Sequence, residues 1–274
     1  MTEQAERYDR IATGYARWWA PVLTPAVLQL LEGVAPLLAA GGRVLDVGTG
    51  TGQLAIEALT RWPTSSIVGI DASGEMRAMA DREAARRLAP EVRVRFETTV
   101  AFADQLPFRD REFDLALSSF VVQLVPNRAR VLREIRRVLR PGATFAYVSW
   151  LQDERIFRPD DIFDDLLDEL EIDAGDEDPG RPGDLPSVER AGGELRRAGF
   201  AGVTARSGEL VHSFTVEGYV GFMTEFHEES LIAGLEPEVR ARFLGTLRDR
   251  LMALPPEQMT MRFPIVFASG RRSS

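Results

Sequence analysis

Residues 43–55 read Arg43-Val44-Leu45-Asp46-Val47-Gly48-Thr49-Gly50-Thr51-Gly52-Gln53-Leu54-Ala55, and this stretch decides the fold. A short run of aliphatic residues stops at alternating glycines, and an apolar-periodic helix follows. This order is typical of the first strand, tight turn and helix of a nucleotide-type α/β fold. Glycine at such a turn permits positive φ and a close approach of ligand to backbone, and the free N–H groups of the helix start attract a carboxylate or a phosphate.

The spacing of the glycines and the acid before them indicate the kind of ligand. A dinucleotide turn reads G-x-G-x-x-G, whereas these glycines stand at 48, 50 and 52. Asp46 lies at the strand end, where its carboxylate would repel a pyrophosphate and attract an ammonium or a sulfonium. The turn therefore favours S-adenosylmethionine (SAM) over NAD, and the alternative is a glycine turn in some other α/β protein.

The stretch resembles motif I of the class I SAM-dependent methyltransferases, of the small-molecule type. Four further segments resemble that family: 8–15 its Y-D-x-I-A-x-x-Y lead-in, 103–108 its motif II, 139–143 its L-(K/R)-P-G-G turn, and 194–200 its L-x-x-A-G-F helix end. The resemblance covers roughly 5–150, 188–212 and 262–271. It implies a Rossmann-like, doubly wound α/β fold whose seven-stranded sheet is mostly parallel with an antiparallel last strand, plus helical cap insertions.

An acid about 20 residues beyond the glycine turn indicates the ribose site. Asp71 ends a second apolar run, and its two acceptor oxygens suit two ribose hydroxyls; the alternative is a helix N-cap. The resemblance assigns further positions to SAM, whose product is S-adenosylhomocysteine (SAH). The full predicted cofactor set is Tyr15, Asp46, Gly48, Thr49, Gly50, Gly52, Asp71, Ala72, Met76, Ala103, Asp104, Ser118 and Ser119.

Two parts of the resemblance leave alternatives open. The family places an acid at the position of Phe102, whereas Asp104 stands two residues later. Either Asp104 accepts from the adenine amine, or Phe102 stacks on the base and backbone groups read it. Tyr15 either touches the cofactor or packs on the core, and for Tyr8 and Trp18 we expect core packing.

Composition limits the partners and the setting. The net charge of −9 argues against nucleic-acid or anionic-membrane binding, although a local basic patch could override it. The absence of cysteine excludes disulfides and thiolate metal sites, and no apolar run reaches the ~20 residues of a membrane span. We therefore expect a cytoplasmic protein with a small-molecule substrate, a monomer or a homodimer.

The chain divides into a core and two insertions. We expect a SAM-binding core with lid helices over 1–150, an acidic helical cap insertion over 151–187, a core helix and strand over 188–214, a second helical cap insertion over 215–261, and a final strand and tail over 262–274. Strands are expected at 43–47, 66–71, 92–96, 113–118, 144–150, 203–214 and 262–270. We interpret the clustered carboxylates of the acidic helix at 160–171 as the solvent-exposed face of a cap helix, and we predict no metal site.

Methyl transfer from a sulfonium is an in-line displacement, so alignment and exclusion of water are the main tasks. A general base is needed only when the acceptor carries a proton of high pKa. Of the two histidines, His212 and His227, the second is the better but weak candidate. Phe120 and Trp150, at strand ends, are candidates for contact with substrate. The alternatives are action on a macromolecule and a non-catalytic SAM-fold protein acting in binding or dimerisation.

Overall fold

A computed structural model of the chain describes residues 3–153, 157–173 and 183–273. Its centre is a seven-stranded sheet in the order β3-β2-β1-β4-β5-β7-β6. β1 to β5 run parallel, and β7 is antiparallel to both β5 and β6, so the predicted sheet is confirmed. The strands are β1 (Gly42–Val47), β2 (Ser65–Asp71), β3 (Phe96–Val100), β4 (Phe113–Ser119), β5 (Leu139–Trp150), β6 (Phe200–Ser213) and β7 (Thr260–Arg272).

Alternate residues of the strands build two apolar layers, one on each face of the sheet. Val44 and Leu115 pack with helices α2 (Ala20–Gly33), α4 (Gln53–Arg61) and α5 (Gly74–Arg87). Leu45 and Ala116 pack on the other face with α7 (Arg128–Val138) and α9 (Val188–Arg197). Because both faces are covered, β1 and β4 are mostly apolar, as parallel strands usually are.

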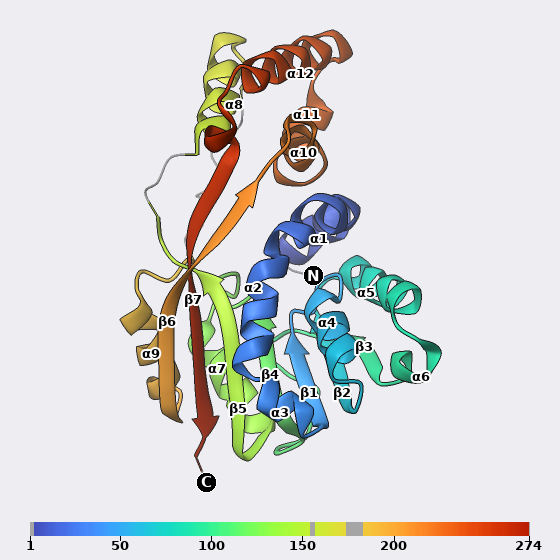
Figure 1. Cartoon of the computed structure of the whole chain (residues 1–274), viewed down its shortest axis with the longest axis vertical. Coiled ribbons are helices and arrows are strands. Elements are labelled where there is room, and N and C mark those ends of the chain that lie inside the picture. The colour runs from blue at the N-terminus through green and yellow to red at the C-terminus, as the bar shows by residue number, and fades with distance from the viewer. Residues whose placement is uncertain (1–2, 154–156, 174–182, 274) are drawn as a thin grey trace.

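A helical cap stands above the sheet. β6 and β7 continue past the other strands as a twisted ribbon that leads to the cap (Figure 1). The cap consists of α8 (Arg158–Glu169), α10 (Val216–Phe222), the π-helical segment η2 (Met223–His227), α11 (Glu229–Gly234), α12 (Pro237–Met252) and the 3₁₀ turn η3 (Pro256–Met259). The apolar side chains of α8 at 162, 163, 166 and 167 are buried here, and Phe163 meets Phe243 of α12 edge-on at 5.1 Å.

The N-terminal helix α1 (Glu3–Gly14) lies between the core and the cap, and α2 runs along the sheet (Figure 1). α1 continues through the π-helical segment η1 (Tyr15–Trp19) into α2, and α3 (Ala35–Ala39) precedes β1. Proline usually breaks a helix, but Pro21 and Pro25 both lie within α2. Pro21 falls in the first turn of α2, where N–H groups lack intrahelical partners, and Pro25 lies inside the helix.

The third strand also differs from the prediction. Residues 90–93 form the short helix α6 (Pro90–Arg93), and β3 begins only at Phe96. Pro90 at the first helical position favours a helix start. Val94, which alternation alone placed inside a strand, is 76% exposed, whereas Phe96 is buried. Most of the acidic loop that we expected over 173–186 lies outside the described residues.

Candidate functional site

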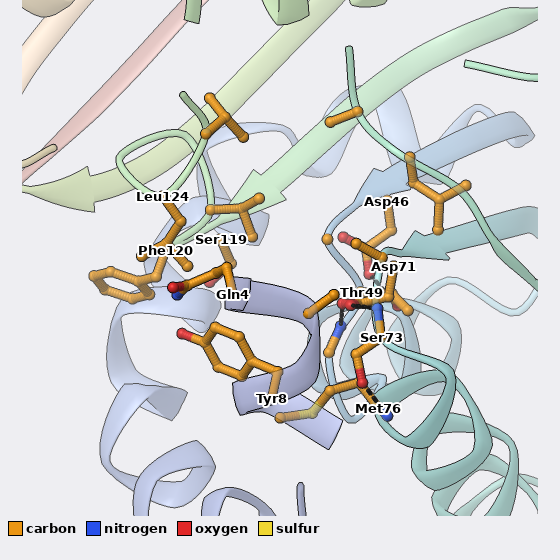
Figure 2. A pocket seen from close by; sticks show the side chains of 18 of the residues that line it. Gln4, Tyr8, Asp46, Thr49, Asp71, Ser73, Met76, Ser119, Phe120 and Leu124 are labelled. Atoms are coloured by element: carbon orange, nitrogen blue, oxygen red, sulfur yellow. Dashed lines mark hydrogen bonds between the residues drawn. The ribbon is translucent and has the colours of Figure 1, made fainter. Parts of the chain in front are cut away.

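A cavity of about 250 Å³ opens at the carboxyl ends of β1, β2 and β4. Asp46, Thr49 and Asp71 lie on one side of it, and Gln4 and Tyr8 of α1 face it from the other side with Phe120 (Figure 2). The predicted cofactor residues that line it are Tyr15, Asp46, Gly48, Thr49, Gly50, Asp71, Ala72, Met76, Ala103, Asp104 and Ser119. The structure thus brings together segments far apart in the sequence at the edge where open α/β sheets bind ligands.

Asp46 is the most perturbed acid of the cavity. Its side chain is 1% exposed, and Oδ2 accepts from the Thr49 hydroxyl at 2.8 Å. Oδ1 is buried and has no hydrogen-bond partner. Burial, with the charge of Asp71 nearby, raises the pKa of the Asp46 carboxyl to about 7. An unpaired buried carboxylate oxygen is costly, so the site fits a ligand that brings a cationic donor.

Asp71 is already engaged by backbone groups. Oδ2 accepts from Gly50 N–H at 2.8 Å and Oδ1 from Ser73 N–H at 2.9 Å. These bonds favour the charged form, but burial outweighs them and raises the pKa of the carboxyl. Each carboxylate oxygen keeps a second lone pair, which can accept from a ligand hydroxyl. The N-cap of α5 is Ser73, and not Asp71, so the capping alternative for Asp71 falls away.

The glycine turn exposes backbone to the cavity. Gly48 has φ +71, and a Cβ there would lie 2.3 Å from the Val121 side chain. Gly50 has φ +54, and a Cβ there would meet nothing within 4 Å, which leaves this face of the turn open. Gly52 is not among the cavity-lining residues. It is the N-cap of α4 with φ +82, and a Cβ there would lie 3.1 Å from the Ala80 side chain of α5. Its role here is helix packing.

Ser118 and Trp150 also lie outside the cavity lining. The Ser118 hydroxyl donates to Val47 O at 2.9 Å and ties β4 to β1. Phe120, the next-but-one residue, lines the cavity with φ +56, an uncommon value for a bulky residue. The Gln123 amide holds this turn by donating to Phe120 O at 2.8 Å, and Trp150 packs behind the Phe120 ring at 4.3 Å.

Another part of the wall contains Ala72, Met76, Ala103, Phe102 and Asp104. Phe102 is 41% exposed and Asp104 lies 3.5 Å from the Arg130 guanidinium. Both residues line the cavity. The two alternatives, in which Asp104 accepts from the adenine amine or Phe102 stacks on the base, therefore stay predictions.

The N-terminal helix forms a lid that sequence reasoning described only in part. Asp9 Oδ1 accepts from the Ser73 hydroxyl at 2.5 Å and from Glu75 N–H at 3.1 Å, which latches α1 onto the start of α5 and lowers the pKa of Asp9. Tyr8, expected as a packing residue, packs against the core and also lines the cavity, and Gln4 was missed.

Comparisons with known proteins agree with this geometry. Residues 45–147 match the family model described as methyltransferase domain. This central part of the chain is therefore similar to a methyltransferase domain. Among curated relatives, the ubiquinone/menaquinone biosynthesis C-methyltransferase UbiE of Geotalea daltonii is 42% identical over 105 residues, covering 38% of this chain and 43% of its own. The demethylmenaquinone methyltransferase of Chlorobaculum tepidum is 32% identical over 150 residues, covering 53% of this chain and 55% of its own. The chain thus spans about half the length of these relatives.

Solved structures share the methyltransferase fold. YcgJ protein from Bacillus subtilis superimposes with a TM-score of 0.58 at 18% identity, covering 93% of this chain and 99% of that one. A Haemonchus contortus phosphoethanolamine N-methyltransferase, in complex with phosphomonomethylethanolamine and SAH, gives 0.56 at 17% identity, covering 91% and 53%. At these identities the likeness concerns the fold alone.

An aromatic cluster joins the core to the cap. It comprises Tyr15, Trp19, Phe120, Trp150, Phe222 and Phe226. Trp19 stacks on Phe226 at 5.8 Å and lies 5.0 Å from Phe222, and Tyr15 meets Phe226 edge-on at 5.5 Å. Tyr15 and Phe120 also line the cavity, so the cluster continues the cavity wall toward the cap.

The two histidines lie outside the cavity lining. His227 stacks on Phe222 at 5.3 Å and approaches Glu228 at 3.7 Å. His212 stands on β6 beside Phe214, and burial lowers the pKa of its imidazole. Burial and the nearby acids raise the pKa of the Tyr15 hydroxyl, so at neutral pH this group donates a proton in hydrogen bonds and does not serve as a base.

Within the described ranges, no group of three or more histidines and acids is placed to hold a metal ion. In the same ranges, none of the helices combines the length and apolarity needed to span a bilayer.

Proposed function

We propose that this chain is a SAM-dependent methyltransferase that transfers a methyl group to a small organic acceptor. The observation that carries the proposal is the buried, unpartnered Oδ1 of Asp46 beside an open glycine turn. A carboxylate in that position needs a cationic donor, and the α-ammonium of SAM is one. When bound, SAM supplies an electrophilic methyl group on its sulfonium.

Different residues of the cavity bind different parts of the cofactor. Asp46 holds the α-ammonium, while the backbone at Gly48 and Gly50 passes close to the amino-acid tail. Asp71 accepts from the ribose hydroxyls with the lone pairs that Gly50 and Ser73 leave open. Ala72 and Met76 flank the adenine, with Phe102 or Asp104 at its edge.

The acceptor is proposed to lie at the aromatic cluster, between the cavity and the cap. Its wall there is apolar, and the cavity-lining set contains neither histidine nor lysine. This chain's residues therefore align the acceptor and exclude water, and they hold the Tyr15 proton in place as a hydrogen-bond donor. Such a site suits an apolar acceptor whose nucleophilic atom needs no strong base. The names of the curated relatives, which refer to quinone biosynthesis, support an acceptor of this kind.

The proposal extends to setting and organisation. The two insertions together form the cap over the acceptor, and the protein acts in the cytoplasm as a monomer or a homodimer without a nucleic-acid or membrane partner. The net charge of −9 and the absence of cysteine support this setting.

Methyl-labelled SAM distinguishes the possible functions. The protein is incubated with labelled SAM and with a metabolite extract, with bulk protein or with RNA. We expect label in the metabolite fraction, and none with Asp71→Asn at the same SAM concentration. Label confined to protein or RNA would refute the small-molecule acceptor, and failure of both SAM and SAH to bind would refute the methyltransferase.

A further inference from the structure

A second cleft, of about 650 Å³, lies between α7 and α9. One loop, residues 124–127, lines both this cleft and the cofactor cavity. Polar groups make up about half of the cleft's lining, whereas the lining of the cavity is mostly apolar. Its lining residues are Gln123, Leu124, Val125, Pro126, Asn127, Arg128, Ala129, Leu132, Arg133, Gly183, Arg190, Glu194, Arg197 and Ala198.

Positive charges outnumber negative ones among the described residues that line the cleft. Four of these residues are arginines, and one, Glu194, is an acid. Glu194 is 10% exposed and already saturated: Arg128 binds both its oxygens, at 2.9 and 3.3 Å, and Arg190 binds one at 3.0 Å. Arg133 and Arg197 have no hydrogen bond or ion pair with any residue in the part of the chain that the structure describes.

The fold places these two free guanidinium groups on facing helices. Arg133 comes from α7 and Arg197 from the end of α9, with the Arg128–Glu194 pair bridging the same two helices. The first turn of α7 also borders the cleft, and its N–H groups add to the positive potential there. The chain has a net charge of −9, so this cleft is a local basic patch that the total charge does not reveal.

We propose that this cleft binds a phosphoryl group, with Arg133 and Arg197 as its ligands and Arg128 and Arg190 as supporting charges. Guanidinium groups bind phosphate oxygens through paired N–H donors, and two that line the same cleft favour a multiply charged phosphate over a single carboxylate. The roomy cleft accommodates a diphosphate. The phosphoryl group belongs either to a separate phosphorylated metabolite or to the far end of the methyl acceptor, since only residues 124–127 separate the two sites.

Calorimetric titration with inorganic pyrophosphate tests the site directly. Wild type is compared with the double variant Arg133→Ala/Arg197→Ala and with a matched control, Arg240→Ala/Arg242→Ala, whose arginines are exposed on α12. We expect binding by wild type and control that weakens as salt is raised, and a dissociation constant at least about tenfold higher in the double variant. Equal affinity in all three proteins, or no binding by wild type at low salt, would overturn the proposal. Circular dichroism verifies that the variants fold.

A second arm identifies the source of the phosphoryl group and rests on the proposed function. Labelled methyl transfer is measured with a metabolite extract before and after alkaline phosphatase treatment. Loss of the labelled product after treatment indicates a phosphorylated acceptor, for which the double variant shows a raised KM with kcat retained. A product that survives treatment indicates a separate ligand. Absence of methyl transfer with either extract counts against the proposed function alone, because the pyrophosphate titration needs no turnover.

Discussion

Replacing Asp46 with asparagine distinguishes the effect of this buried carboxyl on the free energy of unfolding from its effect on ligand affinity. The pKa of Asp46 is about 7 in the folded chain, against about 3.9 for an unperturbed aspartate. The folded form therefore keeps a proton that the unfolded chain loses, and the free energy of unfolding falls as pH rises from about 4 to 7. The difference of about 3 between the two pKa values corresponds to a contribution of at most about 4 kcal/mol to the free energy of unfolding. This contribution is present below pH 4 and is lost above about pH 7.

An asparagine side chain at this position does not titrate, and its carbonyl can still accept from the Thr49 hydroxyl. We therefore expect Asp46→Asn to be more stable than wild type at pH 8, by up to about 4 kcal/mol, and the difference to shrink toward pH 4. Urea denaturation of the ligand-free proteins across this range measures it. Asp168→Asn, an exposed change on α8, is the control and should leave the pH dependence unchanged.

The same substitution should act in the opposite direction on ligand binding. The asparagine side chain lacks the charge that attracts an ammonium, so SAH affinity should fall by about 10- to 100-fold, as expected for loss of a charge-assisted hydrogen bond. A stability difference that is the same at pH 5 and pH 8 would refute the reasoning, because the buried carboxylate would then not hold its proton.

Three further substitutions test neighbouring parts of the account. Asp71→Asn should weaken SAH binding by about 10- to 100-fold in calorimetry while the fold persists, and unchanged affinity would remove the ribose assignment. Asp9→Ala should cost about 1 kcal/mol in urea unfolding at pH 7 and increase hydrogen exchange in α1, an effect that diminishes as the pH falls through the lowered pKa of Asp9 and the wild-type carboxyl is protonated too. Gly14→Ala should cost more than about 2 kcal/mol, because its Cβ would lie 1.7 Å from the Glu225 carbonyl; a thermal midpoint equal to that of wild type would contradict the packing of lid on cap.

The core of the fold could be predicted from sequence because its signals are local. The glycine turn, the apolar strands and the acids at 46 and 71 each lie within a few residues of the feature they specify. The third strand was wrong because Val92 and Val94 alternate like a strand, while Pro90 starts a helix and Val94 has no apolar partner. The sequence did not predict that the helix continues through Pro21. The π-helical segment Tyr15–Trp19, which leads into α2, does not follow the periodicity of an α-helix.

The site could be predicted from the sequence only where the functional residues and the pattern that identifies them lie in one segment. Ser118 and Gly52 fell outside the cavity lining because strand pairing and helix packing, which depend on distant residues, turned them away from it. The latch between Asp9 and Ser73 joins residues 64 positions apart, so no local pattern reveals it. The same holds for the arginine cleft, which forms only when α7 and α9 pack on one face of the sheet.

The claim that Asp46 receives a ligand ammonium can be measured most directly by comparing SAH with its desamino analogue in wild type and in Asp46→Asn. Calorimetric titration of all four pairs gives the coupling between the carboxylate and the amine. We expect loss of the amine to weaken binding to wild type by about 10- to 100-fold and to have little effect on the variant. An equal loss in both proteins, or equal binding of both compounds to wild type, would contradict the account.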